Sequence, residues 1–205
     1  MTVIAASVIA ATMPGGASDR SELPEPSAEL ITAAALAEDY PGDPGIVIAL
    51  LLNRVSLARG EAIYLPAGNI HAYLAGLGVE LMNASDNVLR GGLTPKHIDV
   101  PELLSVLDFR PLPAPYLPGR TSGPGATVYA PTDGDFRLVA IEPGDSTATV
   151  ELTGPAIIIA TAGDMQLAGE RSSASMTRGE SLYATPDERT LRVFGRGTAF
   201  LATTT

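Results

Sequence analysis

A hexapeptide that occurs twice constrains the fold of this chain more than any other feature. Residues 59–64 read RGEAIY and residues 178–183 read RGESLY, with four identities in six positions and an offset of 119 residues. In each copy an Arg-Gly turn leads into a short run typical of a strand, and a proline, Pro66 or Pro186, follows two residues after the tyrosine. Two strand–turn–strand units of the same kind predict a duplicated β-barrel.

The rest of the chain predicts a mainly β protein with a helical region at its start. Ser27 is a helix cap for residues 28–37, residues 46–55 contain good helix formers, and Asp99 caps a further short helix. Alternation, apolar runs and flanking turns predict the strands, which are 62–65, 70–74, 79–82, 136–140, 156–160, 191–194 and 199–201.

Four parts follow from these patterns. Residues 1–57 form a partial helical region, and residues 58–109 carry the candidate site and the short helix. Residues 110–127 contain five prolines and three glycines, so we expect a linker without regular structure. Residues 128–205 form a second β module.

Composition excludes several classes of function. The chain has 205 residues, 45% of them apolar, which is typical of a globular protein. A net charge of −10 argues against nucleic acid as a partner. There is no cysteine, which excludes disulfides and thiolate metal sites. No apolar run is long enough to span a membrane and no basic residue precedes Arg20, so we expect a cytoplasmic protein without a membrane partner.

Five side chains of chemically useful types lie within 26 residues, between His71 and Lys96. His71 and Tyr73 are two apart on a predicted strand, so they share a face. Zinc normally takes three or four ligands, and a single histidine on a strand is more often a hydrogen-bonded structural residue. Arg90 precedes Gly91-Gly92, where the chain can approach a ligand closely, but a solvated arginine on a turn has the same pattern. Asp86 and Lys96 are either part of the site or a surface ion pair.

The runs PAGNIHAY at 66–73 and SDNVLRGGLTPK at 85–96 closely resemble the signature of type I mannose-6-phosphate isomerases, which are zinc enzymes built on cupin barrels. The resemblance covers about residues 40–109 and implies two cupin-like (jelly-roll) modules. It also implies interconversion of mannose 6-phosphate and fructose 6-phosphate, a step of carbohydrate metabolism and GDP-mannose biosynthesis.

The same resemblance implies roles for individual residues. His71 corresponds to a zinc ligand of the family. Arg90 would stabilise the negative charge of an enediolate intermediate, and Lys96 would serve the substrate phosphate or proton transfer. Asp86 would orient a neighbour or act as an acid–base group, and Tyr73 would contact the substrate. Glu80 and His97 are expected to be structural.

The sequence departs from the family in its metal ligands. The family has a Gln and a His in one short motif and a Glu further on, all well before the histidine at position 71, and no such pairing occurs here. The zinc site is therefore expected to be incomplete. Three explanations stay open: a truncated record, a non-catalytic cupin fragment that binds a phosphosugar, or one half of a split enzyme with a separate N-terminal chain. At the repeat offset His71 maps to Thr190, so we expect the second module to lack a metal.

Overall fold

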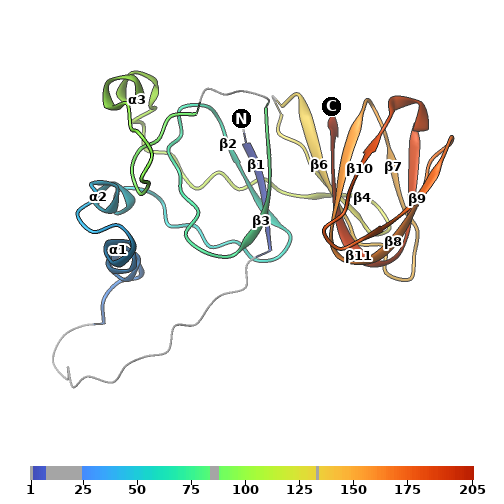
Figure 1. The fold of residues 1–205 in the computed structure, drawn as a ribbon, viewed down its shortest axis with the longest axis horizontal. Helices are drawn as coiled ribbons and strands as arrows, with labels where there is room; N and C mark the ends of the chain where they lie inside the picture. The colour runs from blue at the N-terminus through green and yellow to red at the C-terminus, as the bar shows by residue number, and fades with distance from the viewer. Residues whose placement is uncertain (1, 8–24, 84–87, 133) are drawn as a thin grey trace.

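Two antiparallel sheets and three short helices form the structure, a computed structural model that describes residues 2–7, 25–83, 88–132 and 134–205. The smaller sheet has the strand order β2 (Glu61–Leu65), β1 (Thr2–Ser7), β3 (Leu77–Met82). In Figure 1 the helices lie on one side of this sheet and the larger sheet lies on the other. The prediction of a mainly β protein is confirmed.

The larger sheet contains the remaining eight strands, with the main order β10-β8-β11-β6-β5-β4, while β7 pairs with β11 and β9 with β8. Their bounds are β4 (Arg120–Gly123), β5 (Ala126–Tyr129), β6 (Phe136–Ile141), β7 (Ala148–Glu151), β8 (Ala156–Ala168), β9 (Ser173–Thr177), β10 (Ser181–Ala184) and β11 (Thr190–Thr204). Alternate residues of these strands point inward and form the main core, in which Ile141, Met176 and Leu201 have no exposed surface.

The helices begin where the sequence predicts. Helix α1 (Ala28–Asp39) is capped by the Ser27 hydroxyl, which accepts a hydrogen bond from the amide of Leu30. Helix α3 (Val100–Val106) is capped by Asp99, which accepts from the amide of Glu102 at 3.1 Å. Helix α2 (Gly45–Ala49) is shorter than the predicted 46–55. The apolar residues that follow it are not spaced so that they would lie on one face of a helix, and a longer helix could not bury them together.

A second apolar cluster joins the two sheets. Ala62 on β2 packs with Tyr129 and Leu138 of the larger sheet, and Val79 and Leu81 of β3 pack against the same cluster. The Tyr129 hydroxyl also donates a 2.6 Å hydrogen bond to the carbonyl of Gly60. The face of the smaller sheet that packs on the larger one is therefore defined by alternation along β2 and β3.

The repeated hexapeptide has the same local structure in both places. At the first copy the Glu61 carboxylate accepts from the amide of Ala58 at 2.7 Å, and Gly60 has a φ of 83°. At the second copy Glu180 accepts from Thr177 at 2.7 Å, and Gly179 has a φ of 90°. Both turns need glycine for the left-handed backbone, and both lead into a strand. The repeat is thus structural, whereas the number of barrel modules stays a prediction.

Three expectations are wrong in part. Residues 110–127 are not free of regular structure, because β4 and the start of β5 lie within them and pair with each other. Residues 1–57 contain strand β1 as well as helices α1 and α2. Residues 191–194 and 199–201 belong to one long strand, β11, whose register shifts between Thr198 and Ala199. Short-range patterns do not show that a strand continues through a bulge, or that a glycine-rich hairpin will find a partner.

Candidate active site

The loop after β2 carries His71 and is seated on the end of α3. The carbonyl of Gly68 accepts a 3.0 Å hydrogen bond from the amide of Asp108, and a Cβ at Gly68 would lie 2.9 Å from the carbonyl oxygen of Val106. Gly68 also has a φ of 82°. A glycine is therefore required both for the turn and for the close approach to α3. Residues 70–74 belong to no strand, which corrects the predicted strand there.

The His71 ring is oriented by its own loop. Its Nδ1 lies 3.0 Å from the carbonyl oxygen of Asn69, an acceptor only, so Nδ1 carries the proton and donates. Nε2 is then the acceptor nitrogen of the ring. A carbonyl on one nitrogen is the usual arrangement in histidines that bind a metal through the other. The side chain is exposed, so Nε2 is accessible from solvent.

Tyr73 connects His71 to strand β3. The His71 and Tyr73 rings make an edge contact with centroids 5.9 Å apart, and the Tyr73 phenol donates a hydrogen bond to the carboxylate of Glu80. Burial of the ring and the nearby Glu80 charge raise the pKa of the phenol. Because Tyr73 keeps 60% of its surface exposed, burial of the ring is incomplete, and we attribute the raised pKa mainly to the contact with the Glu80 carboxylate. The phenol is neutral at pH 7 and acts here as a hydrogen-bond donor.

Glu80 was expected to be structural, and the structure places it beside the candidate site residue Tyr73. The signal that could have found it is the two-residue period of β3. Val79 and Leu81 face the larger sheet, so Glu80 must point to the opposite face, toward the loop that carries Tyr73.

The turn that follows Arg90 lies against the His71 loop. A Cβ on Gly91 would lie 2.2 Å from Cδ1 of Ile70, the residue before His71, and 3.7 Å from Cδ2 of Leu103 on α3. Arg90 itself is half-buried. The structure therefore places the residue after Arg90 against the side chain of the residue before His71, although 19 positions separate Arg90 from His71.

The other predicted site residues are less constrained. Lys96 and His97 are exposed, and the amide of Lys96 bonds to the Thr94 hydroxyl at 3.2 Å. Asp86 lies outside the described residues. At the position equivalent to His71 in the repeat, the Thr190 hydroxyl bonds to the Glu151 carboxylate at 3.0 Å.

Zinc is the metal that the resemblance implies, and it needs a suitable set of ligands. His71 fits as one ligand. Within residues 2–7, 25–83, 88–132 and 134–205, no three His, Cys, Asp or Glu side chains lie together in a way that could hold a metal ion. The described residues therefore do not fit a zinc site by themselves, because zinc normally needs at least three protein ligands.

No helix in this described part is long and apolar enough to cross a membrane.

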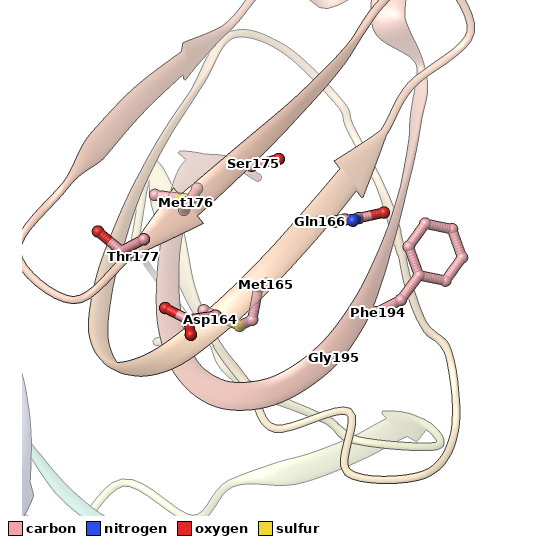
Figure 2. Close-up of a pocket in the computed structure, with 8 residues that line it drawn as sticks. All are labelled: Asp164, Met165, Gln166, Ser175, Met176, Thr177, Phe194 and Gly195. Carbon is pink, nitrogen blue, oxygen red and sulfur yellow. The ribbon is translucent and has the colours of Figure 1, made fainter.

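A hollow of about 360 Å³ lies away from these loops, in the larger sheet (Figure 2). It is lined by Asp164, Met165, Gln166, Ser175, Met176, Thr177, Phe194 and Gly195. Met165 and Met176 belong to the main core, and Asp164 pairs in register with Thr177 across β8 and β9. None of the candidate site residues that the structure describes lines this hollow.

Comparison with known proteins identifies relatives of this chain. The chain is 38% identical over 167 residues to mannose-6-phosphate isomerase of Escherichia coli K12, a match that covers 81% of this chain and 43% of the relative. It is 38% identical over 154 residues to mannose-6-phosphate isomerase 2 of Arabidopsis thaliana, covering 74% of this chain and 35% of the relative. The chain is a homologue of mannose-6-phosphate isomerases. It spans less than half the length of these relatives and corresponds to their C-terminal part.

Solved structures agree with this assignment. The apo form of mannose 6-phosphate isomerase from Salmonella typhimurium superimposes with a TM-score of 0.76 at 33% identity, over 90% of this chain and 47% of that chain. The expected cupin fold of the isomerases is thereby confirmed. No family model matches the chain.

Two further structures of the Salmonella phosphomannose isomerase carry alanine in place of a glutamate and of an arginine that lie ten residues apart. Glu80 and Arg90 of this mannose-6-phosphate isomerase homologue have the same separation.

Proposed function

We propose that this chain is the C-terminal portion of a mannose-6-phosphate isomerase, and that the protein containing it interconverts mannose 6-phosphate and fructose 6-phosphate. The observation that carries the proposal is the contact between two loops that belong to the family signature, the His71 loop and the Arg90 turn, which meet at Ile70 and Gly91. A protein that had kept only the cupin scaffold would have no need to hold these two loops together.

The reaction moves a proton between C1 and C2 of the sugar through an enediolate, whose negative charge needs a fixed cation. Arg90 supplies that cation. Tyr73 contacts the substrate near His71, and Glu80 orients Tyr73 through the hydrogen bond that it accepts from the phenol. The equal spacing of the glutamate and arginine in the Salmonella variants supports placing Glu80 and Arg90 in one site. Lys96 binds the phosphate of the substrate or takes part in proton transfer, and Asp86 orients a neighbour or acts as an acid–base group.

Zinc, when bound, would polarise the sugar oxygens and lower the barrier to proton transfer. His71 is the residue of this chain that would contribute to such a site, through Nε2. Because no three candidate ligands lie together among the described residues, we expect the remaining ligands to come from a further polypeptide segment. The substrate is a phosphorylated hexose in the cytoplasm, and neither nucleic acid nor a membrane is involved.

A second candidate is a cupin fragment that binds a phosphosugar without turnover. It is favoured by the finding that no three candidate metal ligands lie together among the described residues. The two candidates share the substrate and differ in catalysis.

One experiment separates them. Formation of fructose 6-phosphate from mannose 6-phosphate is measured with zinc for the 205-residue chain alone and after mixing it with the N-terminal part of the Escherichia coli relative. The same mixture with His71→Ala is the matched control. Zinc-dependent turnover in the mixture, lost with His71→Ala, supports the isomerase. Binding of mannose 6-phosphate without turnover in any mixture supports the fragment, and absence of both overturns the proposed function.

A further inference from the structure

Asp43 joins two parts of the chain that are fifty residues apart. It lies in the turn between α1 and α2, and its two carboxylate oxygens have different partners. Oδ1 accepts a 2.7 Å hydrogen bond from the amide of Gly45, and Oδ2 accepts a 3.0 Å bond from the amide of Leu93. Each oxygen therefore holds a different loop, and the second loop is the turn that follows Arg90.

That turn has an unfavourable backbone. Leu93 has a φ of 53°, one of two non-glycine residues in the left-handed region among the described residues, and Gly92 has a φ of 137°. A residue other than glycine rarely adopts such a backbone conformation unless its surroundings hold it there. The Asp43 carboxylate supplies such a hold directly at Leu93.

The two loops are also packed without space between them. A Cβ on Gly92 would lie 2.9 Å from Asp43 Oδ1 and 2.9 Å from the Cα of Gly45. A Cβ on Gly45 would lie 3.0 Å from Cγ of Leu93. Glycine at both positions lets the backbones approach to the distance at which one carboxylate can bridge them.

The clamped turn is the one that touches the His71 loop, since Gly91 packs on Ile70. Arg90 is therefore attached to a segment fixed at Leu93 by Asp43 and at Gly91 by Ile70. An arginine that stabilises a developing charge acts only if it is held in place before the reaction, and a displacement of about 1 Å can cost roughly 10²-fold in rate.

We propose that Asp43 is a positioning residue for Arg90, which it holds by clamping the turn at Gly92 and Leu93. Asp43 touches neither the substrate nor the reacting atoms, and the proposal rests on the role given to Arg90 in the proposed function. The plainer alternative is that Asp43 only begins α2, through its bond to Gly45. The bond to Leu93 distinguishes the two, because starting α2 does not require it.

The test compares Asp43→Asn with Asp39→Asn, which removes the same charge from an exposed position at the end of α1. Arg90 is observed through its side-chain Nε–H signal in NMR spectra, and Leu93 and Gly45 through amide hydrogen exchange. We expect Asp43→Asn to shift or broaden the Arg90 signal and to speed exchange at Leu93, whereas Asp39→Asn changes neither. An unaltered Arg90 signal together with faster exchange at Gly45 alone would overturn the proposal in favour of the α2 role.

A double-mutant cycle then asks whether Asp43 acts through Arg90. The affinity for fructose 6-phosphate is measured for the chain, Asp43→Asn, Arg90→Ala and the double variant, with the melting temperature of each. We expect Asp43→Asn to weaken binding about 10-fold to 100-fold when Arg90 is present, and not to weaken it further when Arg90 is absent. The same loss in both backgrounds would show an indirect effect on folding and contradict the proposal.

The outcomes of this test are separable from those of the proposed function. If the unaltered chain binds neither fructose 6-phosphate nor mannose 6-phosphate, the proposed function loses its support. The Arg90 signal and the exchange at Leu93 still decide whether Asp43 holds the Arg90 turn.

Discussion

Glu80 accepts a hydrogen bond from the phenol of Tyr73, and the Tyr73 ring in turn lies edge-on against the imidazole of His71. Strand β3 is rigid because it is paired with β1 along its length, so it can fix Tyr73 on the less regular loop. A residue of the sheet thereby orients the side chain of a loop residue. This positions the side chain more precisely than the turns of the loop would do alone.

Replacing Glu80 with glutamine should lower the pKa of the Tyr73 phenol toward its ordinary value. The substitution removes the negative charge that disfavours the phenolate, while the ring stays equally exposed. Ultraviolet titration of the phenolate band reports this, and subtraction of the Tyr73→Phe curve identifies the Tyr73 signal. A Tyr73 pKa that Glu80→Gln leaves unchanged would mean that burial alone sets it.

The contact between the two site loops predicts a specific steric effect at Gly91. Gly91→Ala should destabilise the protein by about 1–3 kcal/mol, the usual cost of overpacking, because the new methyl group meets Cδ1 of Ile70. Ile70→Val removes that carbon and should recover part of the loss in the double variant. Urea unfolding measures each free energy, and Gly123→Ala, where a Cβ meets nothing within 4 Å, is the matched control. Equal losses with and without Ile70→Val would show that the two loops do not meet in this way.

Much of the fold could be predicted from local patterns. The caps Ser27 and Asp99 begin α1 and α3 as expected, since a cap depends on one side chain and an amide three residues away. The two turns at Gly60 and Gly179 were also predictable, because only glycine adopts that backbone readily. Strand β4 was not, since Arg120–Gly123 is held by pairing with β5 and has no apolar alternation of its own.

The sequence supplies candidate residues for the site but not the contacts between them. The resemblance identified His71 and Arg90, whereas nothing local in the sequence indicates that Asp43 bonds to Leu93 or that Gly91 packs on Ile70. Such contacts depend on the tertiary fold, which brings distant segments together. Glu80 lay within reach of sequence reasoning through the alternation of β3.

Glu188 should make stability depend on pH. Its carboxylate accepts from the Ser172 hydroxyl at 2.5 Å and from the Arg171 amide at 2.8 Å, and these bonds hold its pKa below the usual range. A lowered pKa means that the stabilisation is present above the unfolded value and is lost as the pH falls through the folded value. Glu188→Gln should therefore lower the melting temperature at pH 7, and the two proteins should converge as the pH falls below about 4.

The control for Glu188 is Glu38→Gln, an exposed carboxylate on α1. A difference between Glu188→Gln and the unaltered protein that stays constant from neutral to acidic pH would contradict the assigned role of the Ser172 and Arg171 bonds.

Zinc binding by the 205-residue chain should be weak and below one ion per chain. A single imidazole leaves the other coordination positions to water, and high affinity for zinc comes from a full ligand set. His71→Ala should remove most of the residual binding, whereas His97→Ala should do little. Metal analysis after dialysis measures the stoichiometry, and one tightly held zinc per unaltered chain would contradict the expectation.

The last prediction concerns turnover. The chain alone should show little or no isomerase activity, and joining it to an N-terminal segment that carries the missing ligands should restore it, because the reaction needs the metal and the cation together. In the restored enzyme, Arg90→Ala should lower kcat by roughly 10²–10³, the usual effect of removing one preformed electrostatic contact. Arg192→Ala, an exposed arginine on β11, is the matched control and should leave kcat unchanged. A restored enzyme in which Arg90→Ala turns over as fast as Arg192→Ala would remove Arg90 from the mechanism, while zinc-dependent turnover by the chain alone would show that its metal site is complete.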